Sequence, residues 1–200
     1  MNIRDADARP LSFQSSYGRS AGGSSGLWAR LVGLGAPALR LPFAPGEALD
    51  GSVVSLAELA RRVSLAVFFY GGVASKGTAR GRRGGVGIEA GARVEGWREC
   101  EVELEELGYR IVGVSSQSSE VQVQFALDRM VSSFTFLSDS ELLLADELGL
   151  PTGRGRAGER VYEPLTMLIR DGCIWWVFYP LTSPAVDAEI AIKRIRSPRG

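Results

Sequence analysis

Apolar residues along this chain fall into short continuous runs and into repeats of three to four residues. The run Leu65–Tyr70 (LAVFFY) is apolar throughout, and Tyr109–Ser115 carries Ile111, Val112 and Val114. Continuous apolar runs of this length are typical of strands that are covered on both faces. The pattern therefore predicts a central sheet with helices on each side.

A helical period is clearest after residue 92. The apolar positions there recur at spacings of three or four, with glutamates between them: Val94, Trp97, Cys100, Leu104 and Leu107. This predicts one amphipathic helix over 92–107 that buries Trp97 and Leu104 and ends at Gly108. Further helices are expected at 119–130, with Val121, Val123, Phe125 and Met130 as its apolar positions, and at 140–148 and 185–196, with a short strand at 134–137.

The last third of the chain contains a hairpin signal. Strands at 165–170 and 173–179 flank Asp171-Gly172, a dipeptide that favours a tight turn. Simple alternation places Trp175 and Val177 on one face of the second strand and Trp176 and Phe178 on the other. Apolar residues on both faces indicate core packing or a dimer interface more simply than a ligand platform.

The first part of the chain is rich in residues that interrupt helices and strands. Residues 1–26 are polar and rich in Ser and Gly, which predicts a mobile tail before a single domain over 27–200. The segment Leu27–Leu41 contains Pro37 and leads into an expected edge strand. After a turn at Asp50-Gly51, Ser55 and Glu58 have the spacing of a helical capping box.

Composition narrows the class of protein. The 23 basic and 23 acidic residues balance, so neither nucleic acid nor an acidic membrane surface is expected as a partner. No run of about 18 apolar residues and no signal peptide pattern is present, which predicts a cytoplasmic protein. The chain has no histidine, which removes the commonest general base and metal ligand, and no metal or cofactor is expected.

The order strand, helix, strand, helix, strand, helix, hairpin, helix predicts an α/β fold with a mixed central sheet flanked by helices on both faces. Five segments in this order resemble the peroxiredoxins of the alkyl hydroperoxide reductase and thiol-specific antioxidant type. They are ALRLPFAPGEALDGSVVSLAEL, AVFFYGG, GWRECEVELEELGYRIVGVSSQ, FTFLSDSELLLADELGLPT and YEPLTMLIRDGCIWWVFYP. The resemblance implies a thioredoxin-like fold from about Leu34 to Arg196.

The residues that carry peroxiredoxin chemistry are not at the matching positions. Aligned without gaps from Trp97, the family's peroxidatic cysteine falls near Ala90 and a resolving cysteine near Glu95, and no cysteine occurs from Met1 to Glu99. The family's proline after the first central strand is replaced by Gly71. Its peroxide-polarising arginine, expected two residues before Thr166, is replaced by Pro164.

Two cysteines remain as candidate thiols. Cys100 is expected on the buried face of its helix, where burial would raise the pKa of its thiol and make it inert. Cys173 is expected beside the hairpin turn as a surface thiol. Neither is expected to form a disulfide with the other.

Candidate site residues cluster where strands end and helices begin, because open α/β sheets bind ligands at the carboxyl ends of their strands. The long segment 71–91 carries eight glycines and four cations, and its arginines together with the following helix N-terminus offer a site for a carboxylate or phosphate. A solvated loop is the simpler interpretation of the same segment. The candidate catalytic residues are Tyr70, Glu89, Arg93, Arg98 and Cys100, and the candidate substrate-binding residues are Thr78, Arg80, Arg82, Arg83, Ser115, Ser116 and Gln117.

Three functions fit these residues. The first is a cofactor-free enzyme that acts on a small organic molecule, such as an anion, in specialised metabolism. The second is a thiol-dependent peroxidase that uses Cys100 or Cys173. The third is a non-catalytic binding or interaction protein, and a homodimer fits each of the three functions.

Overall fold

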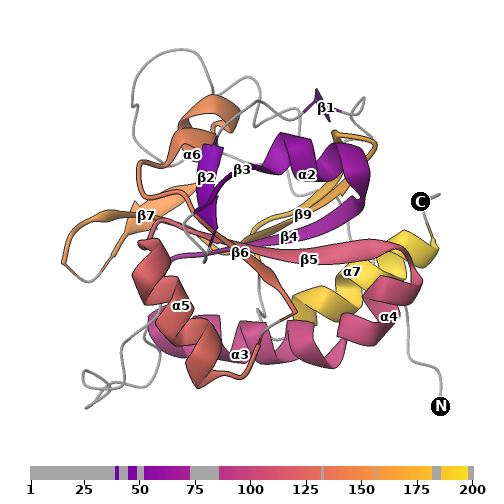
Figure 1. Ribbon diagram of the computed structural model, residues 1–200, viewed down its shortest axis with the longest axis horizontal. Helices are drawn as coiled ribbons and strands as arrows, with labels where there is room; N and C mark the ends of the chain where they lie inside the picture. The colour runs from indigo at the N-terminus through magenta and orange to yellow at the C-terminus, as the bar shows by residue number, and fades with distance from the viewer. Residues whose placement is uncertain are drawn as a thin grey trace.

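The computed structural model describes residues 39–40, 45–48, 52–72, 86–131, 133–155, 157–181 and 186–197 (Figure 1). The expected tail at 1–26, most of the segment Leu27–Leu41 and the turn at Asp50-Gly51 lie outside these residues. No helix in this part of the chain is long and apolar enough to cross a membrane.

An eight-stranded mixed sheet forms the centre of the described structure. Strands β4, β5 and β6 are parallel to one another, and the remaining neighbours pair antiparallel. The order across the sheet is β1 (Leu39–Arg40), β10 (Cys173–Phe178), β9 (Leu165–Arg170), β4 (Ser64–Tyr70), β5 (Tyr109–Ser115), β6 (Thr135–Ser138), β2 (Pro45–Ala48) and β3 (Val53–Ser55). A separate pair joins β7 (Thr152–Arg154) to β8 (Arg160–Tyr162).

Helices cover both faces of the sheet, as predicted. On one face, α2 (Leu56–Arg62) and α6 (Leu143–Leu148) pack on Leu65, Val67 and Phe69 of β4. On the other face lie α3 (Val86–Glu99), α4 (Glu101–Glu106), α5 (Ser119–Asp128) and α7 (Asp187–Arg196), as Figure 1 shows. Because β4 is buried on both sides, its residues alternate between the two cores, and the predicted mixed sheet with helices on both faces is confirmed.

The single helix predicted at 92–107 is two helices, α3 and α4. The backbone of Cys100 (φ −96°, ψ 1°) leaves helical geometry and separates them. Trp97 and Leu104 are fully buried on the same side as expected, because both helices pack on the same core. The helix also begins at Val86, six residues before its predicted start.

Two other helices are shorter than predicted. Helix α5 ends at Asp128, and Met130, expected in the core, has φ 53° and is 82% exposed. Val121 is exposed as well, so the buried face of α5 is formed by Gln122, Phe125 and Ala126 instead. Helix α6 begins at Leu143 rather than at Ser140, because the Asp139 carboxylate accepts hydrogen bonds from the backbone N–H groups of Leu143 and Leu144.

The hairpin has the predicted turn, but the side chains of its second strand do not alternate between the two faces as predicted. Asp171 (φ 54°) and Gly172 (φ 71°) both take the left-handed conformation that a two-residue hairpin turn requires. A β-bulge between Ile174 and Trp176 then interrupts the alternation in β10. The predicted faces are therefore wrong, because Trp175 and Trp176 both pack on the core of α3 and α7 while Val177 packs on the opposite core.

Ser55 occupies the N-cap position of α2, but its side chain makes no capping hydrogen bond. Its buried hydroxyl has no hydrogen-bond partner among the described residues. The predicted capping box is therefore not formed at this helix.

Candidate functional site

The carboxyl ends of β4, β5 and β6 meet at one edge of the sheet. Tyr70 pairs with Ser115 in the β4–β5 ladder, and Ser115 pairs with Ser138 in the β5–β6 ladder. The chain leaves β5 at Ser115, and residues 116–118 lead into α5. This arrangement brings together four of the predicted site residues: Tyr70, Ser115, Ser116 and Gln117.

A hydrogen-bond network fixes the backbone at this edge. The Tyr70 hydroxyl donates to Oε1 of Gln122 (2.8 Å), and Nε2 of Gln122 donates to the carbonyl oxygen of Gln117 (3.0 Å). The Ser138 hydroxyl donates to the same carbonyl oxygen (2.8 Å), and the Gln117 N–H donates to the Ser115 hydroxyl (3.3 Å). Gln117 is thereby held from α5, β5 and β6 at once.

The Gln117 side chain lies against Gly72, just after β4. A Cβ atom at Gly72 would lie 3.4 Å from Cδ of Gln117, and Gly72 has φ 139°. Gln117 and Ser116 are both half-buried, whereas Tyr70, Ser115 and Gln122 are fully buried. A ligand at this edge would therefore meet Gln117 and Ser116, with the buried residues acting through them.

Burial raises the pKa of Tyr70 far above its ordinary value. The phenol therefore stays protonated and donates a hydrogen bond at neutral pH. In this state Tyr70 supports the site as a neutral donor rather than as a base.

Arg93 lies in the interior beneath this edge, between α3, β4, β9 and α7. Its Nε donates to Oδ2 of Asp187 (2.8 Å), and its Nη2 lies 2.6 Å from the same carboxylate oxygen. Its Nη1 donates to the Phe69 carbonyl oxygen, and its Nη2 donates to the carbonyl oxygen of Leu165 and to Oγ1 of Thr166 (2.7 Å each).

Both members of this ion pair are almost completely inaccessible, at 1% for Arg93 and 0% for Asp187. Desolvation lowers the pKa of Arg93, and the Asp187 carboxylate opposes this effect. Each nitrogen of the guanidinium has an internal acceptor, so Arg93 joins the ends of β4 and β9 to α7 and faces no solvent.

Arg98 occupies a different environment on the same helix. Its side chain is 43% exposed and pairs with Glu95 (2.6 Å), which also lies 3.5 Å from Arg129 of the α5 C-terminus. The Arg129 guanidinium packs over Phe125 and against the backbone at Gly91, where a Cβ atom would lie only 2.3 Å from it. These three charged residues form a surface cluster on the outer side of α3 and α5.

The two cysteines lie away from the site edge. Cys100 joins α3 to α4 and is partly exposed. Desolvation, followed by the carboxylates of Glu189, Glu103, Glu99 and Asp187, raises the pKa of its thiol. Cys173 opens β10 opposite Arg170 and Arg40, and both cysteines are free. A thiol with a raised pKa holds less thiolate at neutral pH than an unperturbed cysteine does.

The structure does not describe five of the predicted site side chains. Thr78, Arg80, Arg82 and Arg83 lie outside the described residues, as does the side chain of Glu89. Sequence reasoning also missed the partners Gln122, Ser138 and Asp187. One signal for Asp187 exists in the sequence, since it shares the buried period of Ala188, Ala191, Ile192 and Ile195, and a carboxylate in such a row requires a cationic partner.

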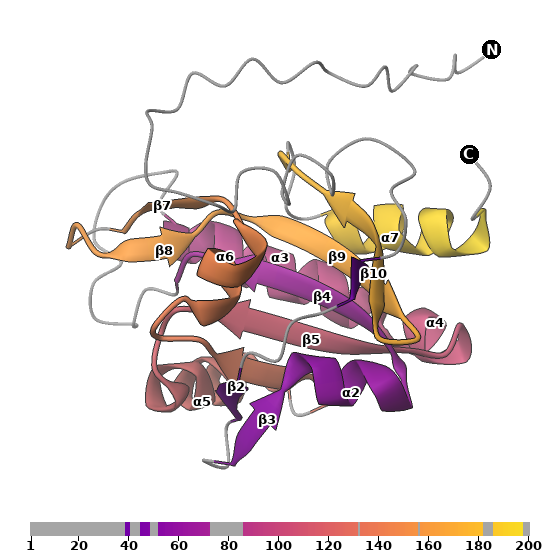
Figure 2. The same ribbon diagram turned by 90° about the horizontal axis from the view of Figure 1, so that it is seen from above.

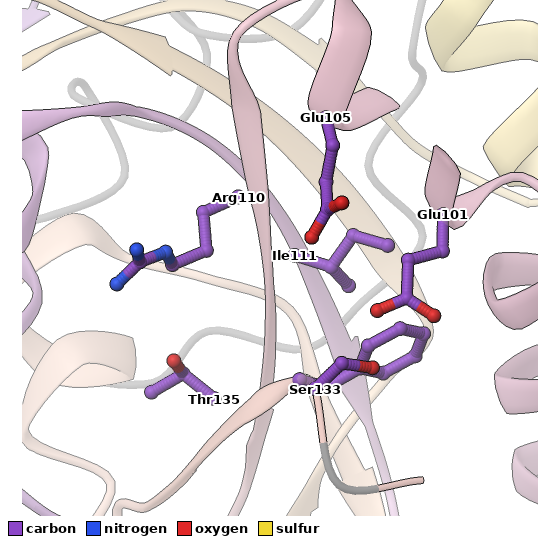
Figure 3. A pocket seen from close by; sticks show the side chains of 7 residues that line it. Glu101, Glu105, Arg110, Ile111, Ser133 and Thr135 are labelled. Carbon is purple, nitrogen blue, oxygen red and sulfur yellow. The ribbon is translucent and has the colours of Figure 1, made fainter. Parts of the chain in front are cut away.

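A small polar pocket of about 140 Å³ lies at the opposite, amino end of the parallel strands (Figure 3). It is lined by Glu101 and Glu105 of α4, whose carboxylates lie near Ile111 and Ser133. The Arg110 side chain of β5 points away from these carboxylates, toward the side where Thr135 lies. It shares no residue with the edge that holds Tyr70 and Gln117. Among the described residues, no group of three or more Asp, Glu or Cys side chains is placed to hold a metal ion.

No protein family description matches the sequence, and no curated protein matches it. Several solved structures match the fold. The structure of peroxidoxin BcpB from Mycobacterium tuberculosis has a TM-score of 0.65 at 20% identity, covering 82% of this chain and 97% of that one. PrxQ from Xylella fastidiosa gives 0.65 at 16% identity (81% and 94%), and reduced Prx3 from Vibrio vulnificus in complex with hydrogen peroxide gives 0.63 at 16% (80% and 98%). The chain therefore has the thioredoxin-like fold of the peroxiredoxins.

Proposed function

We propose that this chain is a cofactor-free enzyme on a peroxiredoxin-like scaffold, which binds a small polar organic molecule at the carboxyl ends of β4 and β5 and does not use a thiol. The observation that supports this proposal most strongly is that the positive charge of Arg93 is compensated inside the protein. A peroxidase needs a thiolate stabilised by nearby positive charge. At the junction of β4 and β9, Arg93 is buried, paired with Asp187 and bonded to Phe69, Leu165 and Thr166, so its charge is compensated internally.

The position of Ala90 supports the same proposal. This residue, at which the peroxidatic cysteine falls in the gap-free alignment, is 3% exposed and packs in the core with Phe68, Tyr70 and Trp97. Cys100 follows ten residues later, which corresponds to about 15 Å along a helix. A thiol at Cys100 would not reach the edge where β4 ends.

The described groups at the edge favour recognition by neutral hydrogen bonds. The half-buried side chains here are the Gln117 amide and the Ser116 hydroxyl. The backbone at Gln117 is fixed by Gln122, which Tyr70 in turn contacts through its hydroxyl. Such an edge can orient a carboxylate, amide or hydroxyl of a ligand and can act by positioning it. A non-catalytic binding protein is the second candidate, because no unpaired base is found among the described residues of this edge.

The proposal is tested by calorimetric titration of the full chain with a panel of small carboxylic acids and their matching amides. For any compound that binds, Gln117→Ala is expected to weaken the affinity by about fivefold, because one hydrogen bond contributes about 1 kcal/mol. Ser133→Ala, in the pocket at the other end of the strands, is the matched control and should leave the affinity unchanged. An unchanged affinity in Gln117→Ala would show that the ligand does not bind at this edge.

A further inference from the structure

The β-bulge in β10 builds a second cluster of charged and aromatic side chains. Because the bulge falls between Ile174 and Trp176, both Trp175 and Trp176 turn to the face of the sheet covered by α7. Figure 2 shows α7 beside β9 and β10 on this side of the molecule. Bulges re-aim side chains at the cost of ladder hydrogen bonds, so this one places two indoles where regular alternation would place one.

Two arginines pack against these rings. The guanidinium carbon of Arg170, at the end of β9, lies 5.6 Å from the Tyr109 ring centroid and 5.3 Å from that of Trp175. That of Arg194, on α7, lies 5.9 Å from Trp175 and 5.1 Å from Trp176. Trp175 thus contacts both guanidinium groups, and we call these five residues the arginine–tryptophan cluster.

The positive charges in this cluster have no carboxylate partner among the described residues. Arg170 donates one hydrogen bond to the Tyr109 hydroxyl (2.7 Å), which also accepts from Nε1 of Trp175 (3.2 Å). Nε of Arg194 is buried without an acceptor in the described structure. Five other arginines of the described residues do form ion pairs with Asp or Glu: Arg93, Arg98, Arg129, Arg160 and Arg196.

An aromatic ring and a carboxylate occupy different parts of a guanidinium group. A carboxylate occupies the N–H groups in the guanidinium plane, whereas a stacked ring contacts the flat face and leaves the in-plane N–H groups available. The rings also hold the side chains in place, so less conformational entropy is lost when an anion binds. A guanidinium fixed in this way is prepared for an oxyanion, which can accept two parallel hydrogen bonds from one arginine.

The geometry points to an oxyanion-binding site at the arginine–tryptophan cluster, for the carboxylate or phosphate group of a small molecule. The site is distinct from the edge that holds Tyr70. Ile169, next to Arg170, pairs with Leu65 at the start of β4, five residues from Tyr70, which corresponds to about 17 Å along a strand. A ligand here would be a second ligand of the protein and does not depend on the proposed function.

The test is an NMR titration of the full-length chain, in which the Nε–Hε signals of arginines are followed as inorganic phosphate or benzoate is added. We expect saturable shifts of the Arg194 and Arg170 signals with at least one of the two ions, and the stronger ion identifies the ligand class as phosphate or carboxylate. Arg194→Gln should weaken the affinity by at least about tenfold, because charge-assisted hydrogen bonds are lost.

Arg196→Gln is the matched control. It removes the same charge from the same helix, but from an arginine paired with Glu103 (2.8 Å), and should change the affinity less than twofold. Arg194→Lys keeps the charge and loses the planar donor pair, so it should also weaken binding while preserving the fold. The inference is overturned if neither ion gives a saturable shift, or if Arg196→Gln weakens binding as much as Arg194→Gln does, which would indicate general charge screening.

Discussion

Arg93→Ala is expected to lower the free energy of unfolding by about 3–5 kcal/mol, because it leaves the buried carboxylate of Asp187 without its cation. Asp187 is 0% exposed, and its Oδ1 already lacks a hydrogen-bond partner among the described residues. The substitution also removes the donors to the carbonyl oxygens of Phe69 and Leu165, which are fully buried residues. Urea unfolding followed by circular dichroism measures the change.

Arg98→Ala provides the comparison on the same helix. Arg98 is partly exposed and pairs with Glu95 at the surface, so its loss should cost no more than about 1 kcal/mol. The double variant Arg93→Met with Asp187→Leu replaces the buried charges by apolar groups and should recover most of the lost stability. A cost for Arg93→Ala as small as that for Arg98→Ala would show that the ion pair does not stabilise the junction of β4, β9 and α7.

Gly113→Ala is expected to destabilise the protein by about 1–3 kcal/mol through overpacking, although glycine is normally unfavourable within a strand. Gly113 lies at the middle of β5, opposite Phe68 and Phe136 in the neighbouring strands. A Cβ atom there would lie 2.8 Å from Cζ of Phe68 and 2.9 Å from Cδ1 of Phe136. These rings pack edge to face with each other, with centroids 6.4 Å apart, so neither can move without disturbing the core.

Gly153→Ala is the matched control in strand β7. A Cβ atom at Gly153 would lie no closer than 3.5 Å to Glu163, an ordinary contact, so a change within about 0.5 kcal/mol is expected. Thermal unfolding of the two variants gives the comparison. Equal stability of Gly113→Ala and the unsubstituted chain would mean that the phenylalanine pair tolerates the methyl group.

The central strands and the buried face of α3 and α4 could be predicted because they depend on local apolar patterns. The face predicted for the helix at 119–130 was partly wrong, since Val121 and Met130 are exposed. β5 has the predicted bounds, and β4 begins one residue early, because strands buried on both sides are apolar along their whole length. Helix ends were less predictable. The break at Cys100 and the start of α6 at Leu143 depend on backbone geometry and on the Asp139 cap, neither of which changes the apolar period.

The candidate site was only partly predictable, because some of its contacts follow from strand order and others join residues far apart in the sequence. The meeting of Tyr70, Ser115 and Gln117 follows from strand order alone, since the carboxyl ends of parallel strands share one edge. The position of Arg93 does not, because its partner Asp187 lies 94 residues away and its acceptors Phe69 and Leu165 are backbone carbonyl groups. A positive residue near a helix start is consistent with ligand binding and with burial, and only the tertiary structure distinguishes the two.

The most direct test of a scaffold that works without a thiol is the initial rate of hydrogen peroxide consumption, with dithiothreitol as reductant. The unsubstituted chain is compared with the double variant Cys100→Ser, Cys173→Ser and with dithiothreitol alone. Because burial and the surrounding carboxylates raise the pKa of the Cys100 thiol, we expect all three rates to agree. A rate well above that of dithiothreitol alone, abolished in the double variant, would contradict the proposed function and identify the chain as a thiol peroxidase.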